Sequence, residues 1–399
     1  MKKLLLLGGS RYIIPVIKAA HKLGIYVITC DYLPDNIGHQ YADEYHNVSI
    51  IDKDAVLKLA YELNIDGIMS FATDPGVIVA AYVAEKLGLS FCPYDSVEIL
   101  QNKDLFREFL RKNGFNVPQS VGGENKDQVI DKIGTFRFPV IVKPVDSAGS
   151  KGVTKVEDIL NLDEAINHAK SYSKTGRFIV EEFIEQEGHS SDSDCFSIDN
   201  QLVCASFSCQ YFDGRAKNPY TPAAYSWPSD MPSCKIEELR AEIDRLIKLL
   251  NLKTAIYNVE TRVGKNGNAY IMEVSPRGGG NRLAEIVKLA SGEDMILNSV
   301  KAAVGLPLDK LKNPVYDGAW AEYILHGDKD GLFSHLEIDP LFEEKYVVEK
   351  DLWVKPGDII HAFTGANETI GTLVMKFESQ IELSEKLADI RKYVKVIVK

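Results

Sequence analysis

Short apolar runs alternate with amphipathic stretches over the N-terminal part of the chain. Residues 4–7 are consecutive leucines, and they end at Gly8-Gly9. A wholly apolar run of this kind is typical of a strand buried on both faces of a parallel sheet. Strands that alternate with helices predict an α/β fold with an N-terminal doubly wound parallel sheet. The other elements expected here are strands over 26–31 and 66–71 and helices over 12–23, 54–63 and 75–89.

The pattern changes in the central part of the chain. Residues 97–114 have the periodicity of one long helix that ends at Gly114. Strands over 138–145 and 177–184 enclose a glycine-rich loop at 146–152. A central α+β domain and a C-terminal β-rich domain are therefore predicted. The remaining expected elements are helices near 125–133, 163–173 and 235–251, hairpins over 195–210 (turning at Asp199-Asn200) and 255–275, a long loop with four prolines over 211–233, and strands from about 310.

The glycines after the first strand invite comparison with a dinucleotide-binding turn. Gly8-Gly9-Ser10-Arg11 lacks the G-x-G-x-x-G spacing, although Asp31 ends the second expected strand where a ribose-binding acid would lie. The glycines instead favour a tight strand-to-helix turn whose amides could hold an anion.

Composition narrows the class of partner. The chain has 399 residues and a net charge of -11 at pH 7, without a basic block, so nucleic acid and anionic membranes are not expected partners. The six cysteines form no Cys-x-x-Cys pair and no zinc-type spacing with histidines, which favours buried thiols in a reducing cytoplasm. No apolar stretch approaches the ~20 residues that span a bilayer. We expect a cytoplasmic protein.

The expected hairpin over 255–275 carries the sharpest chemical signal. Asn266-Gly267 is typical of a two-residue type I′ turn. Such a turn places Lys265 opposite Asn268, and outward from there Arg262 opposite Ile271, Thr261 opposite Met272, Glu260 opposite Glu273 and Asn258 opposite Ser275. Two facing carboxylates repel each other, and a divalent cation with a preference for oxygen, such as Mg²⁺, would remove the conflict. The alternative is two acids on a solvated face.

Two further segments have candidate chemistry. The strand that ends at Lys143 leads into a loop with Gly149 and Gly152, so backbone amides and an ammonium group could meet phosphate oxygens. A surface turn is the alternative. At the end of the strand with Glu181-Glu182, a nucleotide base could meet backbone polar groups, with Phe183 or Ile184 against its ring. The alternative is an ordinary strand with a charged end.

In this order, the three segments resemble the ATP-grasp superfamily, and the resemblance extends from the N-terminal α/β region through Asn102-Lys103-Asp104 to the β-rich tail. It implies a pre-ATP-grasp domain over 1–95, an ATP-grasp domain over 96–310 with a mobile lid at about 115–180, and a C-terminal domain over 311–399. The implied ATP-binding residues are Lys103, Lys143, Ser147, Gly149, Ser150, Gly152, Glu181, Glu182, Phe183 and Ile184. Glu260, Glu273 and Ser275 are the implied ligands of Mg²⁺ (or Mn²⁺), and Arg277 the implied arginine that stabilises an acyl phosphate and the following tetrahedral intermediate.

Three positions depart from the superfamily pattern. Ser275 stands where an asparagine is usual, so either its hydroxyl or Asn258 completes the metal site. The usual ribose-binding acid falls near Gly188, and Glu187, Asp192 and Asp194 remain alternatives. The segment 278–282 is rich in glycine, and Arg282 is expected either to grip the reacting carboxylate or to be a surface arginine.

The resemblance implies an ATP-dependent carboxylate–amine (or carboxylate–thiol) ligase that forms an acyl phosphate and releases ADP and phosphate. We expect small-molecule carboxylate and amine substrates, such as amino acids, and a homodimer is one assembly that this class allows. The alternatives are a bicarbonate-using carboxylase or purine-pathway synthetase of the same superfamily, and a non-catalytic ATP-binding sensor. The loop 211–233 would cover the site, with Tyr211, Tyr220, Tyr225 and Trp227 either lining an acceptor pocket or packing.

Overall fold

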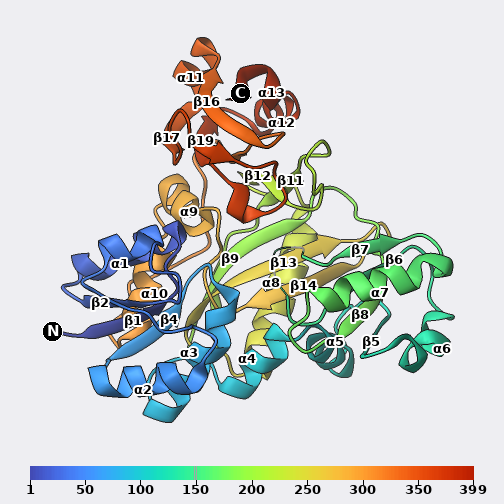
Figure 1. The fold of residues 1–399 in the computed structure, drawn as a ribbon, viewed down its shortest axis with the longest axis horizontal. Coiled ribbons are helices and arrows are strands. Elements are labelled where there is room, and N and C mark those ends of the chain that lie inside the picture. Colours follow the sequence, from blue (N-terminus) through green and yellow to red (C-terminus); the bar gives the residue numbers. More distant parts are fainter. Residues whose placement is uncertain (148, 150) are drawn as a thin grey trace.

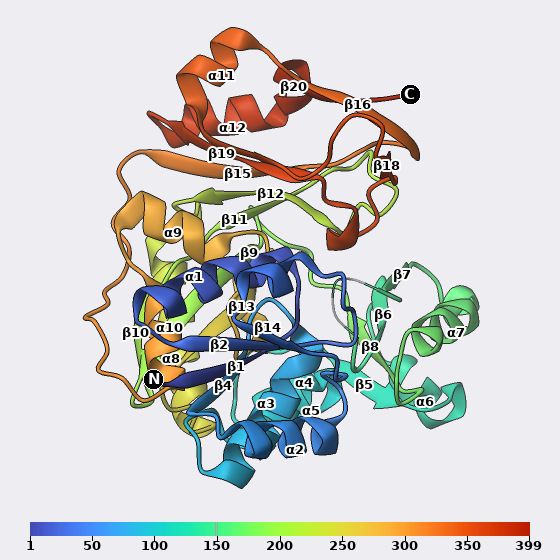
Figure 2. The same ribbon diagram turned by 60° about the vertical axis from the view of Figure 1, so that its left-hand side comes forward.

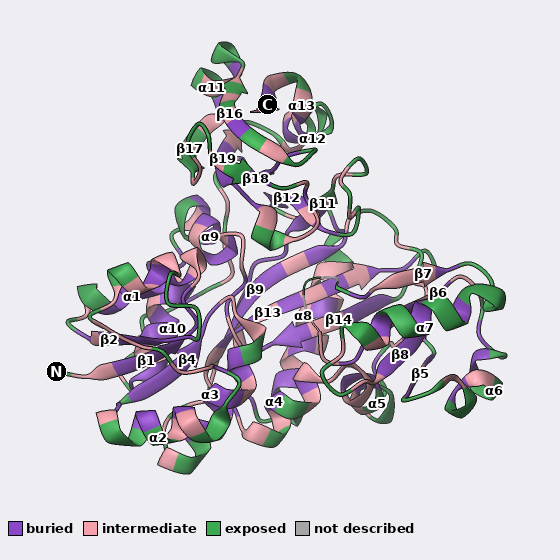
Figure 3. Cartoon of the chain, viewed as in Figure 1, coloured by how far each residue is buried: buried purple, intermediate pink, exposed green. Residues whose placement is uncertain are grey.

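The computed structural model describes residues 1–147, 149 and 151–399. A four-stranded central sheet lies between an N-terminal α/β unit, a second four-stranded sheet, and a C-terminal β-rich unit (Figure 1). Buried residues concentrate in the sheets, whereas α2, α7 and α11 turn exposed faces outward (Figure 3). No helix in the described ranges has both the length and the apolar character needed to cross a membrane.

The N-terminal sheet is parallel, with the order β3-β2-β1-β4. Leu4 and Leu6 pack into one core cluster and Leu5 and Leu7 into another, so the sheet is covered on both faces as predicted. The unit consists of β1 (Lys3–Leu7), β2 (Tyr26–Cys30), β3 (Glu44–His46) and β4 (Gly67–Ser70), with α1 (Ile14–Lys22), α2 (Lys53–Leu63) and α3 (Asp74–Leu87).

The expected single helix over 97–114 is wrong. The structure has α4 (Tyr94–Gln101) and α5 (Lys103–Lys112), separated by Asn102 in an extended conformation (φ -113°, ψ 111°). Tertiary contacts explain the break, because the Lys103 N–H donates to the Val145 carbonyl (3.0 Å) and the Gln101 amide donates to Ser275 (3.1 Å). The break places Lys103 at the first residue of α5.

The second sheet, which we call the lid sheet, is antiparallel with the order β5-β8-β6-β7. Val140, Val142 and Val180 pack on one face against α6 and α7, while Lys143 and Glu181 face the opposite way into a cavity. Its elements are β5 (Ser120–Gly123), β6 (Val140–Pro144), β7 (Thr154–Val156) and β8 (Phe178–Glu182), with α6 (Ile130–Ile133) and α7 (Leu162–Ser171).

The central sheet has the order β10-β9-β13-β14. The predicted hairpin turn at Asp199-Asn200 is confirmed, since both residues have the left-handed conformation that a type I′ turn requires (φ 49° and 64°). The elements of this region are β9 (Ser191–Ile198), β10 (Gln201–Ala205), β13 (Ala255–Val263) and β14 (Ala269–Ser275), with α8 (Ser233–Leu249), α9 (Leu283–Ser291) and α10 (Met295–Ala303).

The β13–β14 register differs from the prediction near its turn and agrees with it farther out. The Gly264 N–H donates to the Asn268 carbonyl, so the turn has one residue more than expected, and Arg262 pairs with Tyr270 instead of Ile271. Thr261 pairs with Ile271, and a bulge at Met272 then takes up the extra residue. Beyond the bulge, Glu260 faces Glu273 and Asn258 faces Ser275, as predicted.

The expected long loop over 211–233 is wrong. It contains the end of β11 (Cys209–Phe212) and all of β12 (Pro222–Trp227), which join the C-terminal sheet in the order β11-β12-β15-β19-β17 (Figure 2). Pro222 opens β12 and Pro228 follows it, so the prolines flank the strand, where no ladder bond is lost. Trp227 is fully buried in the core and lines no acceptor pocket.

The β-rich C-terminal region is confirmed, and three helices are added to it. The expected domain limits stay a prediction, but β11 and β12 link the middle of the chain to this region through the β12–β15 pairing. Its elements are β15 (Ala319–Leu325), β16 (Gly331–Ile338), β17 (Val347–Leu352), β18 (Ile359–Ile360), β19 (Gly371–Phe377) and β20 (Val394–Val398), with α11 (Pro340–Tyr346), α12 (Gln380–Ala388) and α13 (Ile390–Tyr393).

The buried position of Trp227 gives a stability prediction. Trp227→Ala should lower the free energy of unfolding by about 3–5 kcal/mol, the usual cost of truncating a large core side chain. Tyr220, which is 42% exposed in the loop between β11 and β12, is the matched control, and Tyr220→Ala should cost about 1 kcal/mol or less. Urea denaturation measures both. Equal losses in the two variants would show that β12 is not part of the core.

Candidate functional site

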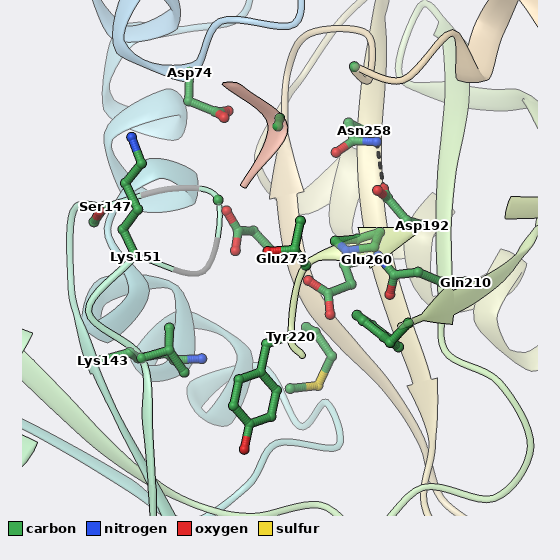
Figure 4. Close-up of a pocket in the computed structure, with 18 of the residues that line it drawn as sticks. Asp74, Lys143, Ser147, Lys151, Asp192, Gln210, Tyr220, Asn258, Glu260 and Glu273 are labelled. Atoms are coloured by element: carbon green, nitrogen blue, oxygen red, sulfur yellow. Dashed lines mark hydrogen bonds between the residues drawn. The ribbon is translucent and has the colours of Figure 1, made fainter. Parts of the chain in front are cut away.

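A cavity of about 400 Å³ opens between the lid sheet, the central sheet and the N-terminal unit. Figure 4 shows Glu260 and Glu273 near its centre, with Lys143 and Lys151 approaching from the side of the lid sheet. The cavity brings together predicted residues from segments far apart in the sequence. These are Lys103, Lys143, Ser147, Gly149, Glu181, Glu182, Phe183, Ile184, Glu260, Glu273 and Arg277.

The two facing acids each have a cation nearby. Lys103 Nζ lies 3.7 Å from a Glu273 oxygen, and an Arg262 nitrogen lies 3.8 Å from a Glu260 oxygen. Both acid side chains are partly exposed to the cavity. The repulsion between the acids is therefore partly offset by the protein itself, and a divalent cation is not the sole compensating charge.

Asp192 adds a third carboxylate, because it lies opposite Glu260 on β9 and also lines the cavity. Burial, together with the negative charges of Glu260 and Asp194, raises the pKa of Asp192 to about 7. Of the three candidate ribose-binding acids, Asp192 alone is among the described residues that line this cavity. Asp194 is buried, and its carboxylate accepts a hydrogen bond from the Gly279 N–H (2.8 Å).

The structure separates the two candidates for the third metal ligand. The Ser275 hydroxyl donates to Asp74 (2.9 Å) and accepts from Gln101, and the described lining of the cavity does not include Ser275. Asn258 does line the cavity, and its amide nitrogen donates to Asp192 (2.7 Å). The geometry therefore favours the Asn258 side-chain oxygen over the Ser275 hydroxyl.

Lys143 belongs to a buried cluster of charges that the sequence did not reveal. Glu181 accepts from Lys143 Nζ at 2.5 Å, and Arg107 Nε lies 2.6 Å from the other Glu181 oxygen. Burial alone would raise the pKa of Glu181, but the charges of Arg107 and Lys143 lower it to about 2. For Lys143, burial outweighs the Glu181 charge and lowers the pKa.

The cluster gives the Glu181 side chain a positioning role, while the predicted hinge contact of its backbone stays a prediction. The Glu181 carboxylate holds Lys143 in place and is not free to meet a nucleotide base. Arg107 follows Phe106 on α5, and no local signal distinguishes it from a surface arginine, because its partners lie on distant strands.

The loop after β6 is tied to the site through Lys103, whose Nζ donates to the Ser147 carbonyl (2.7 Å). Gly149 lines the cavity with φ +70°, a conformation that suits glycine. A Cβ at Gly152 would lie 2.9 Å from the Tyr172 side chain, so Gly152 allows close packing and is not among the lining residues described. Ser150, also predicted to bind ATP, lies outside the described residues. Lys151 lines the cavity and was not predicted.

The predicted hinge runs along the end of β8. The Glu182 carboxylate accepts from the Arg137 N–H (2.7 Å), and the N–H groups of Glu182 and Phe183 donate to the carbonyls of Gln119 and Pro139. The Glu182 carboxylate and these two N–H groups are therefore occupied within the lid sheet, while Glu182, Phe183 and Ile184 all line the cavity.

Arg277 is held by a residue of the N-terminal unit. Its Nε and an Nη donate to the two oxygens of Asp74 at 2.9 and 2.8 Å. Burial by itself would raise the pKa of Asp74, but the Arg277 charge and its hydrogen bonds lower it. Asp74 opens α3 and was not predicted, because only the fold brings α3 to the end of β14.

Arg282 is placed elsewhere. It lines a neighbouring cavity of about 510 Å³, where one of its nitrogens lies 2.5 Å from Glu349 and 3.5 Å from Glu285. Arg282 has a left-handed backbone conformation (φ 58°) and stands directly before α9. Its side chain contacts Glu349 of the C-terminal unit. The expected grip of Arg282 on the reacting carboxylate does not fit this position.

Comparison with known proteins agrees with this geometry. Residues 136–285 match the family model described as an ATP-grasp domain. This part of the chain is an ATP-grasp domain. The predicted resemblance is confirmed, and the relatives support the predicted enzyme class, an ATP-dependent, ADP-forming ligase.

Relatives with known names cover most of the chain. It is 25% identical over 318 residues to the formate-dependent phosphoribosylglycinamide formyltransferase of Vibrio vulnificus, covering 77% of each chain. Two solved structures share the fold over the whole chain: phosphoribosylglycinamide synthetase from Anaerococcus prevotii (TM-score 0.78, 23% identity, 100% of both chains) and L-amino acid ligase from Bacillus licheniformis (TM-score 0.81, 20% identity, 100% of this chain and 99% of that one).

The buried cluster gives a prediction about acid stability. Glu181→Gln leaves Arg107 and Lys143 without their counter-charge, and should lower the free energy of unfolding at pH 7 by about 3–5 kcal/mol. Because the folded-state pKa of Glu181 is depressed from 4.5 to about 2, its contribution is present above pH 4.5 and is lost as the pH falls toward 2. The difference between wild type and variant should therefore shrink over that range.

The matched control is Glu182→Gln. Glu182 accepts from the Arg137 N–H, a bond that a glutamine oxygen also makes, and the Arg137 side chain is 87% exposed. This control should lose less than about 1 kcal/mol. Denaturation at several pH values measures both variants, and a pH-independent loss in Glu181→Gln would contradict the account.

Proposed function

We propose that this ligase joins a small carboxylate, such as an amino acid, to an amine through an acyl phosphate. The observation that carries the proposal is the single cavity in which Lys103 and Lys143 meet the Glu260–Glu273 pair. Cations on one side suit phosphate oxygens, and paired acids suit a divalent ion bound to those oxygens. Arg277 extends the same cavity toward the N-terminal unit.

The donor set fits magnesium. Glu260, Glu273 and the Asn258 amide offer hard oxygen ligands on neighbouring strands, and Asp192 lies beside them. These residues would hold one or two Mg²⁺ (or Mn²⁺) ions together with nucleotide phosphates. When bound, the ion supplies positive charge to the phosphate oxygens during transfer.

The chain's own residues would orient ATP and neutralise its charge. Lys143, fixed by Glu181 and Arg107, presents its ammonium group to the phosphates without large side-chain motion. Lys103 binds the loop at Ser147 and so couples loop position to the phosphate site. A carboxylate oxygen would attack the γ-phosphorus, ADP would leave, and the amine would then displace phosphate from the acyl phosphate.

Arg277 would act at the reacting carboxylate. Asp74 accepts from Nε and one Nη, and the other Nη donates to the Gly278 carbonyl (3.0 Å), which fixes the orientation of the guanidinium at the cavity wall. A planar guanidinium held in this way can stabilise the negative charge on carboxylate and phosphoryl oxygens together. Asp74 would thus position Arg277 without contacting substrate itself.

The far end of the cavity supports a small polar substrate. The Tyr12 hydroxyl donates to the Asn281 oxygen (3.1 Å), and the Asn281 amide donates to the Tyr225 hydroxyl (3.3 Å). Phe363 and Ile324 complete this end from the C-terminal unit. Among the aromatic residues expected at the acceptor pocket, Tyr220 and Tyr225 line the cavity, which supports a role for these two.

A purine-pathway synthetase, acting on a phosphorylated acceptor, is the second candidate. The sequence relative named above favours it. The neighbouring cavity is lined by charges of both signs, Arg11, Lys18, Lys350 and Arg282 together with Glu285, Glu349 and Asp351. A phosphorylated acceptor and a zwitterionic substrate would both find charge partners there, and the substrate panel distinguishes the two candidates.

Product analysis over a substrate panel tests the proposal. With the right amino acid and amine, we expect ADP and inorganic phosphate, and hydroxylamine should trap the acyl phosphate as a hydroxamate. Glu260→Gln and Glu273→Gln should abolish ADP release, while Glu185→Gln, an exposed acid paired with Lys265, should keep it. Formate with phosphoribosylglycinamide belongs in the panel, and turnover there alone would replace the amino-acid proposal by the second candidate. AMP and pyrophosphate as products would contradict both.

A further inference from the structure

Three metal-binding side chains meet outside the ATP cavity, although they are well separated in the sequence. His189 Nδ1 lies 2.8 Å from one Asp230 oxygen, and Cys209 Sγ lies 3.2 Å from the other. One ligand atom from each of the three residues lies within 4.8 Å of the other two. His189 precedes β9, Cys209 opens β11 and Asp230 follows β12, so only the folded chain brings them together.

The ligand types and the partial exposure of these three side chains suit a Zn²⁺ ion. A thiolate, an imidazole and a carboxylate are the ligand types that Zn²⁺ accepts, and together they balance its charge. Ligands at ordinary zinc bond lengths are about 3.3–3.6 Å apart in a tetrahedron. The His189–Asp230 and Cys209–Asp230 separations, 2.8 and 3.2 Å to the two carboxylate oxygens, lie within about half an ångström of this range. Cys209 is fully buried, whereas His189 and Asp230 are partly exposed, which leaves one side open to solvent. We propose that His189, Cys209 and Asp230 bind one Zn²⁺ ion, with water as the fourth ligand.

Neighbouring groups support a thiolate at this position. The Asp230 backbone N–H donates to Cys209 Sγ at 3.2 Å. Donors of this kind stabilise a charged ligand sulfur. The His189 ring packs against Tyr211 (4.4 Å between ring centres), which fixes its orientation.

A second cluster in the described part of the chain serves as a contrast. Asp213, His326 and Asp328 also lie close together, but the Arg391 guanidinium is ion-paired with both carboxylates. That cluster already contains its cation. In the His189–Cys209–Asp230 cluster, by contrast, the ion pairs described for Asp230 include no arginine or lysine.

The position of the cluster gives the metal a structural role. Gln210, next to Cys209, lines the ATP cavity, and so do Tyr220 and Thr221 in the loop between β11 and β12. Cys209 and Asp230 stand at the two ends of this β11–loop–β12 segment. An ion bound here would fasten both ends to the start of β9 and fix the segment that borders the cavity.

Metal titration of the full chain tests the site. We would use a Cys234→Ser background, which removes the exposed cysteine, strip the protein of metal, and add Zn²⁺ or Co²⁺ in excess Mg²⁺. One equivalent should bind, and Co²⁺ should give the near-ultraviolet thiolate-to-metal charge-transfer band. Adding Cys209→Ser should abolish this band and weaken zinc binding by at least roughly 10–100-fold. Glu260→Gln and Glu273→Gln should leave the cobalt band and the zinc affinity unchanged, because Glu260 and Glu273 lie in the ATP cavity and not in this cluster.

If Cys209→Ser does not fold, His189→Gln and Asp230→Asn test the site instead. Both side chains are partly exposed, so the fold should tolerate their replacement. Each should weaken zinc binding while the metal-free protein keeps its melting temperature to within a few degrees. Absence of tight zinc binding in the background protein, or a cobalt complex without the charge-transfer band, would overturn the proposal. So would zinc binding that survives these substitutions. The cluster would then be a hydrogen-bonded network held by the His189 proton.

Discussion

The contacts of the buried Arg107 guanidinium connect the parts of the site. One nitrogen pairs with Glu181 in the lid sheet, and another donates to the Met272 carbonyl in the central sheet (2.8 Å). Glu181 in turn holds Lys143, and Met272 is the bulge residue that brings Glu260 opposite Glu273. A single side chain on α5 therefore ties the phosphate-binding lysine to the acid pair. Removing such a charge leaves its partner buried and uncompensated, which is costly.

The three cationic groups that we assign to the reaction are each held by a partner from another part of the fold. Lys143 has Glu181, Arg277 has Asp74 of the N-terminal unit, and Lys103 has the Ser147 carbonyl. These partners fix the positions of the charges before any substrate binds. Electrostatic stabilisation of a transition state depends on such preorganisation, because groups already in place need no reorganisation during the reaction. The geometry of the site therefore depends on how the N-terminal unit, the lid sheet and the central sheet pack together.

The sequence predicted those features that follow from local periodicity. The leucines of β1 and the turn at Asp199-Asn200 have unambiguous patterns. The facing of Glu260 and Glu273 was also predicted, but only because two deviations cancel: the turn at Gly264 is longer by one residue, and the bulge at Met272 restores the register. Counting residue pairs outward from the turn cannot reveal this bulge, because the contact that holds Met272 comes from Arg107, outside the hairpin.

Features that depend on tertiary contacts were missed. The break at Asn102 and the roles of Arg107 and Asp74 arise from contacts with strands distant in the sequence, and the prolines around β12 suggested a loop where a strand reaches the C-terminal sheet. The cysteines were expected to be buried thiols, which is correct for five of them and wrong for the exposed Cys234. The sequence spacing showed no Cys/His cluster, because Cys209 meets His189 and Asp230 only where β9, β11 and the end of β12 converge.

The central claim is that one cavity places a divalent ion on the acid pair and nucleotide phosphates on the two lysines. A crystal structure with Mg²⁺ and a non-hydrolysable ATP analogue tests it most directly. The account predicts the ion bonded to oxygens of both Glu260 and Glu273, with the ammonium groups of Lys103 and Lys143 at the phosphates. A nucleotide bound elsewhere, or an ion that contacts neither carboxylate, would contradict it.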